Sequence, residues 1–262
     1  MDSWGCFGDA RPEAAVLEVR GLSKSFGGLK AVDQASFHVG KDEIVALIGP
    51  NGAGKTTLFA AIAGFTRPDA GTVRFQDRDI TGLPPHRICA CGMVRTFQIT
   101  QPFLRLSVLE NVMVGAYHTT PDRREASARA EEVARRVGMD RQLDMRADAL
   151  TLAGRKRLEL ARALATRPKF LLLDEVMSGL NPIEVEEIVQ IVRAIREAGV
   201  AILLIEHVMQ AVVSLAERVY VLSNGRIIAD GAPASIAADA RVIEAYLGHG
   251  AAARLMHGGA HA

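Results

Sequence analysis

Eight residues near position 50 have the composition of a phosphate-binding loop. The stretch from Gly49 to Thr56 reads GPNGAGKT and is followed by a second hydroxyl at Thr57. Glycines allow successive main-chain N–H groups to converge on an anion, Lys55 supplies a fixed cation for the outer phosphates, and the Thr56 hydroxyl is a ligand for Mg²⁺. A flexible glycine turn is the alternative, and the complete pattern disfavours it. The candidate loop residues are Gly49, Pro50, Asn51, Gly52, Ala53, Gly54, Lys55, Thr56 and Thr57.

A second segment with candidate catalytic residues, FLLLDE at 170–175, ends in two acids. Asp174 is placed to hold Mg²⁺ through water, and Glu175 is placed to orient or deprotonate an attacking water. Acids often end buried strands, so this segment alone is weak evidence. Together with the loop at 49–56 it predicts phosphoryl transfer from a nucleotide.

A histidine and a glutamine are further candidates for the same site. His207, which ends LLIEH, has an imidazole that could sense a γ-phosphate, although a lone histidine at a strand end is more often structural. Gln98 in VRTFQ could reach a metal or a water with its amide. Neither residue would indicate a site by itself.

The segments around these residues alternate between strand and helix patterns. VLEVRGL and ASFHVGKDEIVALIG predict strands, and the latter ends at Gly49 with a helix expected to begin near Gly54. KFLLLDEV and VAILLIEH are short apolar runs typical of parallel strands buried on both faces. Between them, Asn181 as N-cap and Gly199 as stop predict a helix. Asn224-Gly225 predicts a hairpin turn.

The middle third of the chain is rich in helix formers. EASARAEEVARRV from Glu125 to Val137 predicts one helix, and RKRLELARALA after Gly154 predicts another. A mostly parallel sheet wrapped by helices, with a helical insertion, follows from this order of elements.

Composition excludes several other classes of protein. Lys plus Arg number 31 and Asp plus Glu 30 in 262 residues, so no net field draws the chain to nucleic acid or to an anionic bilayer. No run approaches the roughly 18 apolar residues of a membrane span. Three cysteines without disulfide or zinc spacing predict reduced thiols in a cytosolic protein.

The order of these motifs resembles the ATP-binding subunits of ABC transporters over about residues 16–248. The resemblance implies an α/β P-loop NTPase fold with a mostly parallel core sheet, an antiparallel β subdomain and an inserted helical subdomain at about 99–166. Disordered tails are expected at 1–15 and 249–262. It also implies that Phe26 stacks on adenine, that Gln98 couples ATP to membrane subunits, and that His207 is the switch histidine. Asn181 in SGLNP stands where many members have Asp.

The signature segment departs from the family pattern. The family usually reads LSGGQ before a helix, whereas this chain reads LTLAG from Leu150 to Gly154. Thr151 keeps a hydroxyl and Ala153 keeps an N–H, but the alanine methyl is expected to crowd the place where glycine lets the backbone approach phosphate. Thr151, Ala153 and Gly154 remain candidate nucleotide contacts. Arg155-Lys156-Arg157 is expected to flank the dimer interface or to form a solvated face.

Several phrases are similar to a narrower group within that family. FGGLKAVD, RTFQ, LLIEHVM, GAPASI and RVIEAYLG look like the larger ATPase subunit of high-affinity branched-chain amino-acid importers and their relatives for amides and urea. The resemblance implies an ATPase that uses ATP and Mg²⁺ as a homo- or heterodimer at the cytoplasmic face of the cell membrane. Its partners would be hydrophobic permease subunits and, indirectly, a periplasmic or extracellular solute-binding protein, but no nucleic acid. Two alternatives remain open at this point: a soluble ABC ATPase acting on ribosomes or DNA, and a simple P-loop kinase.

Overall fold

The central sheet is built mainly from short apolar strands that run parallel to one another. The computed structural model describes residues 15–97 and 101–247, and within this part the sheet has the order β10-β9-β3-β8-β7-β6. Every residue of β3, β7 and β8 is buried, because helices or a second sheet cover both faces. The strands are β3 (Ile44–Ile48), β6 (Met93–Arg95), β7 (Phe170–Asp174), β8 (Ala201–Ile205), β9 (Arg218–Ser223) and the antiparallel β10 (Arg226–Gly231).

Alternate residues of the central strands enter two different cores. In β3, Ala46 and Ile48 belong to a core shared with the helical part of the chain, whereas Val45 and Leu47 belong to a core shared with the second sheet. Side chains alternate along a strand with period two, so one five-residue strand contributes to both cores. The predicted parallel sheet that is buried on both faces is confirmed.

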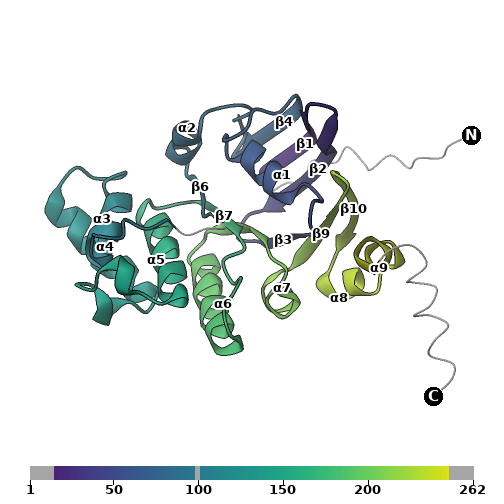
Figure 1. Cartoon of the computed structure of the whole chain (residues 1–262). Helices are drawn as coiled ribbons and strands as arrows, with labels where there is room; N and C mark the ends of the chain where they lie inside the picture. The colour runs from purple at the N-terminus through teal and green to yellow at the C-terminus, as the bar shows by residue number, and fades with distance from the viewer. Residues whose placement is uncertain (1–14, 98–100, 248–262) are drawn as a thin grey trace, which may run out of the picture.

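A four-stranded antiparallel sheet lies beside the central sheet (Figure 1). Its order is β2-β1-β4-β5, and helix α1 (Lys55–Ile62) buries Leu58, Phe59 and Ile62 in the core that both sheets share. The strands are β1 (Ala15–Phe26), β2 (Leu29–Gly40), β4 (Ala70–Phe75) and β5 (Arg78–Asp79), and the short helix α2 (Pro85–Ala90) follows them. The phosphate loop therefore leads into a helix that is held between two sheets.

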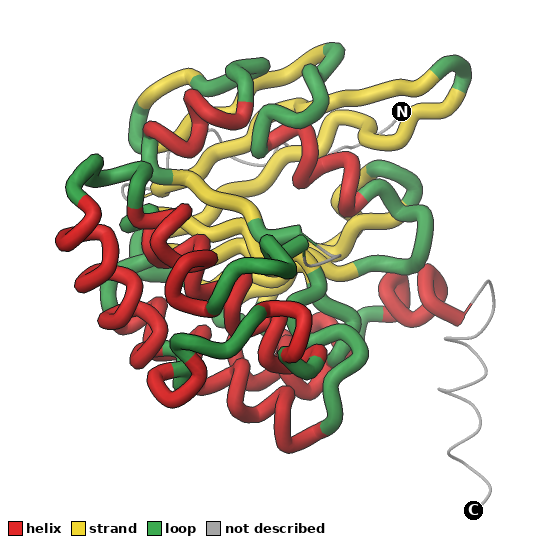
Figure 2. The backbone as a smooth tube through the Cα atoms, turned by 60° about the vertical axis from the view of Figure 1, so that its left-hand side comes forward, coloured by secondary structure: helices red, strands yellow, loops and turns green. Residues whose placement is uncertain are grey.

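The predicted helical part of the chain forms a lobe at one end of the molecule, and Figure 2 shows its helices grouped beside the strands. Its elements are α3 (Val108–Ala116), α4 (Arg123–Arg136), η1 (Asp140–Gln142), η2 (Ala147–Ala149) and α5 (Leu152–Ala165). The second predicted helix begins earlier than expected, because the Thr151 hydroxyl accepts a hydrogen bond from Gly154 N–H and caps it at its N-terminus. The signature segment thus contains the N-cap and the start of the first turn of α5.

The remaining helices cover the central sheet on the side of the helical lobe. They are α6 (Pro182–Glu197), α7 (Met209–Leu215), α8 (Pro233–Ala237) and α9 (Ala240–Leu247). Asn181 caps α6 in a reciprocal capping box with Glu184, as the sequence predicted for the cap. The β9–β10 hairpin turns at Asn224 and Gly225, which both have the positive φ that a tight primed turn requires.

Some expectations about the chain ends, thiols and membrane spans involve residues outside the described part. The predicted tails at 1–15 and 249–262 lie outside the described residues, apart from Ala15, which is the first residue of β1. Residue 248, predicted to be the last of the ATP-binding domain, is not described either. Cys89 and Cys91 are free thiols, as predicted, whereas Cys6 lies outside the described residues. No helix in residues 15–97 and 101–247 has the length and apolar character needed to span a bilayer.

Candidate functional site

The loop between β3 and α1 has a backbone that only glycine allows at two of its positions. Gly49 has φ 154° and Gly54 has φ 103°, and a Cβ on either would lie 2.0–2.1 Å from a main-chain oxygen of Leu222 or Ala31. Ala53 donates from its N–H to Pro50 O at 3.2 Å and accepts from Gly225 N–H at 2.9 Å, which fixes the centre of the loop. Hydrogen bonds and close main-chain contacts therefore fix the loop where it packs on the protein, whereas Asn51 and Gly52 are exposed to solvent.

Lys55, the first residue of α1, folds back across this loop. Its Nζ donates to Gly49 O at 2.7 Å and to Pro50 O at 3.0 Å. Burial lowers the pKa of Lys55, and the nearby carboxylates of Glu175 and Asp174 oppose that shift. The loop lysine and both predicted acids are therefore in one electrostatic environment, although more than a hundred residues separate them in the chain.

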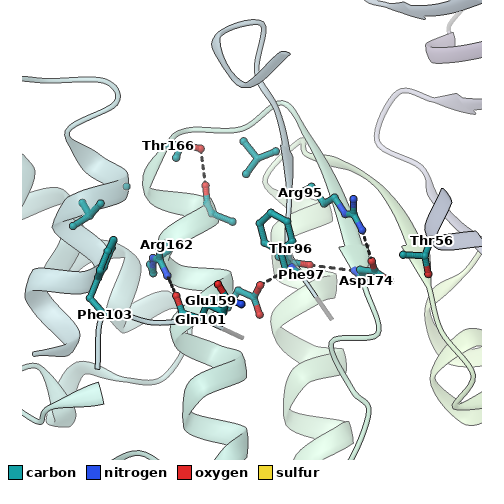
Figure 3. A pocket seen from close by; sticks show the side chains of 14 residues that line it. Thr56, Arg95, Thr96, Phe97, Gln101, Phe103, Glu159, Arg162, Thr166 and Asp174 are labelled. Carbon is teal, nitrogen blue, oxygen red and sulfur yellow. Dashed lines mark hydrogen bonds and ion pairs between the residues drawn. The ribbon is translucent and has the colours of Figure 1, made fainter. Parts of the chain in front are cut away.

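Asp174 lies at the end of β7, with its side chain only 2% exposed. One carboxylate oxygen, Oδ2, accepts a hydrogen bond from Arg95 Nη2 at 2.8 Å, and its main-chain N–H donates to Thr96 Oγ1 at 3.2 Å (Figure 3). Asp174 and Thr56 both line a cavity of about 750 Å³ that continues toward the helical lobe. The structure thus brings two of the three predicted Mg²⁺ ligands, Thr56 and Asp174, to the wall of one cavity, whereas Gln98 lies outside the described residues.

Glu175 has a strained backbone that its neighbours hold in place. Its φ is 50°, in the left-handed region that a residue with a side chain rarely adopts. Its N–H donates to Ile205 O at 2.9 Å, and its carbonyl oxygen accepts from Lys156 Nζ at 3.0 Å. Strain of this kind costs about 1–3 kcal/mol and is concentrated at functional sites. This backbone marks Glu175 as a residue whose orientation matters.

His207 lies next to Glu175, after the end of β8. Its Nδ1 is 3.9 Å from Glu175 Oε1, and its side chain is 59% exposed. The predicted histidine and the predicted catalytic acid are therefore adjacent, and the histidine faces solvent, where a nucleotide or a second subunit can approach.

Phe26 is an exposed aromatic residue at the end of β1. It exposes 52% of its surface, although large apolar side chains are usually covered. Lys24 Nζ lies 5.5 Å from the ring centre, so one contact of the ring is with a cation. A solvent-facing ring between β1 and β2 is available to stack on a base.

The signature residues form the first turn of α5. Thr151 is exposed and its hydroxyl is engaged as the helix cap, whereas Ala153 is only 5% exposed. Gly154 N–H donates to the Thr151 hydroxyl at 3.1 Å. Ala153 therefore contributes little to the exposed surface at this end of α5, and a role for these three residues in nucleotide binding stays a prediction.

Gln98 lies outside the described residues, but the residue before it is anchored to the helical lobe. Phe97 N–H donates to Glu159 Oε1 at 2.6 Å, which joins the segment after β6 to α5. Burial raises the pKa of Glu159, and the Phe97 hydrogen bond opposes that shift. Arg162 and Phe103, which stack at 4.9 Å, line the same cavity farther along the lobe. The segment that carries Gln98 thus begins between the acid site and the helical lobe.

The sequence did not predict the contacts that three residues make in the site. Arg95 pairs with Asp174, Lys156 holds the Glu175 carbonyl, and Glu159 holds Phe97. Each is a common charged residue in a segment that contains other charged residues. In the sequence, only its closeness to Gln98 or to the signature segment could have drawn attention to it. Tyr246 of α9 also reaches the loop: burial raises its pKa, and a hydrogen bond with the Gly49 main chain opposes the shift.

Comparison with known proteins assigns the site to a family. The family model described as "ABC transporter" matches residues 32–178, more than half of the 262-residue chain. A second model, described as "Branched-chain amino acid ATP-binding cassette transporter", matches residues 226–252. Both matches contain elements that border the phosphate loop.

Curated relatives match almost the whole chain. The high-affinity branched-chain amino acid transport ATP-binding protein LivG of Salmonella typhimurium is 39% identical over 249 residues, which covers 89% of this chain and 98% of the relative. BraF of Pseudomonas aeruginosa, which has the same description, is 38% identical with the same coverage. The lipopolysaccharide export system ATP-binding protein LptB of Escherichia coli is 37% identical over 235 residues.

Solved structures agree in fold. A nucleotide-free ATP-binding cassette from an ABC transporter has a TM-score of 0.82 and 32% identity, covering 88% of this chain and 98% of that one. A cassette in its ADP conformation matches with the same TM-score and identity over 90% of this chain. The phosphate loop, the paired acids, the family model and relatives of nearly full length agree: the chain belongs to the ABC transporter family, as one of its ATP-binding subunits.

Proposed function

We propose that this chain binds and hydrolyses ATP to power an ABC importer. The observation that carries the proposal is the meeting of Lys55, Asp174 and Glu175 beside one rigid glycine loop. Main-chain N–H groups of the loop and the Lys55 ammonium would bind the phosphates, and exposed Phe26 would stack on adenine. The remaining loop residues, from Asn51 to Thr57, supply the cradle.

Mg²⁺ fits the residues present. Thr56 and Asp174 offer oxygen donors on one cavity wall, and Mg²⁺ prefers oxygen ligands completed by water and phosphate rather than an all-protein cage. The described part of the chain has no cluster of three His, Cys, Asp or Glu side chains that could hold a metal ion. When bound, Mg²⁺ would neutralise charge on the transferred phosphoryl group, and Gln98 would be a further ligand.

Glu175 and His207 perform the chemical step in this proposal. The Glu175 carboxylate orients a water and accepts its proton, and the strained, doubly held backbone at φ 50° fixes the direction in which that carboxylate points. His207, 3.9 Å away, contacts the outer phosphate. Preorganised groups of this kind lower the barrier because they need not reorganise during the reaction.

The working unit is a dimer, with each phosphate loop facing the partner's signature. Thr151, Ala153 and Gly154 at the start of α5 would contact the partner's nucleotide through the Thr151 hydroxyl and helix N–H groups. The partner is either a second copy or a homologue with an intact signature. In the second case the two nucleotide sites are unequal.

Hydrophobic permease subunits would dock at the cavity between the acid site and the helical lobe. Its lining includes the exposed rings of Phe97 and Phe103 and the charged side chains of Glu159 and Arg162. Such an apolar surface with a few charges suits a helix from a membrane subunit. The chain would then lie at the cytoplasmic face of the cell membrane, with a solute-binding protein acting on the far side and no nucleic acid involved.

The imported solute is proposed to be a branched-chain amino acid or a related small polar solute. The match of residues 226–252 and the descriptions of LivG and BraF support this choice. A soluble ABC ATPase acting on ribosomes or DNA is disfavoured by the balanced charge of 31 basic and 30 acidic residues. A simple kinase leaves the proximity of His207 to Glu175 unexplained.

The proposal is tested by calorimetric titration with Mg-ATP of the wild type and of Lys55→Ala. We expect the substitution to weaken binding at least about tenfold and to abolish turnover, because the phosphates lose their fixed cation. Lys41→Ala, in the turn after β2, is the matched control and should bind like the wild type. Wild-type affinity in Lys55→Ala would contradict the loop assignment. Co-purification of the tagged chain with two permease subunits tests the transport role separately.

A further inference from the structure

Arg95 is a buried cation that pairs directly with the carboxylate of Asp174, the residue proposed to hold Mg²⁺. It ends β6, which runs parallel to β7 with Arg95 opposite Leu172, two residues before Asp174. Its side chain is 8% exposed and that of Asp174 is 2% exposed, and their Nη2 and Oδ2 atoms are 2.8 Å apart (Figure 3). An ion pair removed from water on both sides interacts strongly, and breaking it leaves a buried charge without compensation.

Two aromatic rings hold the guanidinium of Arg95 in place. Its central carbon lies 5.6 Å from the ring centre of Phe65 and 5.5 Å from that of Phe97. The two rings are 5.4 Å apart and nearly perpendicular, at 81°. Arg95 Nε is buried and has no hydrogen-bond partner among the described residues. Within residues 15–97 and 101–247, the cation is therefore held by the two rings and by the Asp174 carboxylate.

The neighbouring residues hold the main chain on both sides of the pair. The Thr96 hydroxyl accepts from Asp174 N–H at 3.2 Å and donates to Leu172 O at 3.4 Å. Phe97 N–H is bound by Glu159 at 2.6 Å. Arg95 thus lies on a segment whose neighbouring residues are anchored beside Asp174.

We infer that Arg95 is a positioning residue that orients Asp174 and limits how tightly Mg²⁺ binds beside it. The inference rests on the proposed function, in which Asp174 holds the metal through water. A fixed positive charge on one oxygen holds the buried carboxylate in one direction, yet it repels a divalent cation that approaches the other oxygen. A weakened hold on Mg²⁺ favours release of the hydrolysed nucleotide with its metal, a step that often limits turnover.

The test compares ATP affinity in EDTA with ATP affinity at saturating Mg²⁺, by calorimetry, for the wild type, Arg95→Met and Arg95→Lys. The ratio of the two affinities measures the gain from magnesium and cancels any direct effect of Arg95 on ATP. Methionine keeps most of the volume without the charge, so the ratio is expected to rise at least about fivefold, since one nearby unit charge no longer opposes the divalent ion. Lysine keeps the charge, and its ratio should stay within about twofold of the wild type.

An unchanged or lower ratio in Arg95→Met would overturn the inference, and so would a rise in Arg95→Lys equal to that in Arg95→Met. If Arg95→Met is not recovered folded, Phe65→Leu replaces it. That change removes one ring contact and should raise the ratio at least about twofold because the cation is held less firmly; no rise would again overturn the inference. Failure of the proposed function is distinguishable, because the wild type itself would then bind no ATP in either buffer.

Discussion

Lys156 donates a hydrogen bond from Nζ to the main-chain oxygen of Glu175 across 3.0 Å. The lysine is only 3% exposed and belongs to α5, the helix that begins at the signature segment. Glu175 follows β7 and has φ 50°. A buried cation from the helical lobe therefore supports the strained backbone of the residue that we propose as the catalytic base.

Lys156→Met is expected to slow ATP hydrolysis about 10- to 100-fold while ATP affinity stays within about twofold, because Glu175 loses a group that directs it but the phosphate loop is intact. Steady-state phosphate release and calorimetric titration of the same preparation measure the two quantities.

Arg157→Met is the matched control for Lys156→Met. It removes a positive charge from the same turn of α5, but Arg157 pairs with Glu187, whose side chain is half exposed. Turnover near the wild-type rate is expected, since Arg157 pairs with a carboxylate of α6, whereas Lys156 holds the Glu175 carbonyl. Equal losses in the two variants would mean that general charge at α5, rather than support of Glu175, controls the rate.

Glu175→Gln should separate binding from hydrolysis. The amide retains the shape of the carboxylate but cannot accept a proton from water, so turnover is expected to fall by about 10²–10⁴. ATP binding should persist, with the nucleotide trapped in a closed dimer that gel filtration detects. Glu187→Gln, on the exposed face of α6, controls for removal of one carboxylate. Hydrolysis near the wild-type rate in Glu175→Gln would exclude this residue as the base.

Phe26→Ala should weaken ATP binding roughly tenfold, because an aromatic–base stack is worth about 1–3 kcal/mol. Affinity for tripolyphosphate should not change, since the ring does not face the phosphates in this proposal. Competition with a fluorescent ATP analogue measures both ligands. Phe103→Ala, which removes an exposed ring from the helical lobe, should leave both affinities unchanged. A parallel loss of tripolyphosphate binding in Phe26→Ala would indicate a damaged loop rather than a lost stack.

Glu206 predicts a pH dependence of stability. It is 1% exposed; its Oε1 accepts from Met177 N–H at 2.9 Å, and its Oε2 has no hydrogen-bond partner within the described ranges. Burial raises the pKa of Glu206 above its ordinary value of 4.5, against the opposing Met177 hydrogen bond. The folded chain therefore retains this proton to higher pH than the unfolded chain, so stability falls as pH rises from about the ordinary value through the raised pKa.

Glu206→Gln keeps the acceptor for Met177 and removes the titration. The decrease in Tm between pH 5 and pH 8 should be smaller in this variant than in the wild type, as measured by calorimetric melting. Some decrease should remain, because burial also raises the pKa of Glu159. Glu197→Gln, at the exposed end of α6, should follow the wild-type curve. A Glu206→Gln curve parallel to the wild type would show that this carboxyl does not control the pH dependence.

Local patterns in the sequence determined most of the elements and the loop chemistry. Gly49 and Gly54 were recognisable because a phosphate loop needs backbone conformations that other residues avoid, and those conformations are now seen. Asn181 and Asn224-Gly225 were recognisable because caps and tight turns depend on a few adjacent residues. Asp174 and Glu175 followed from their place after an apolar run. All of these features are governed by contacts within a few residues.

Contacts between distant segments were decided only by the tertiary structure. The cluster Arg155-Lys156-Arg157 was predicted to flank the dimer interface or to form a solvated face; the solvated face is wrong for Lys156, which is buried and holds the Glu175 carbonyl, and the interface flank stays a prediction. Arg95 pairs with Asp174 because β6 and β7 are neighbours in the sheet, although 79 positions separate the residues. A charged residue has the same sequence signature whether it faces water or a buried partner. Strand order and helix placement decide between the two, since they set which distant backbone and carboxylate groups each charge must satisfy.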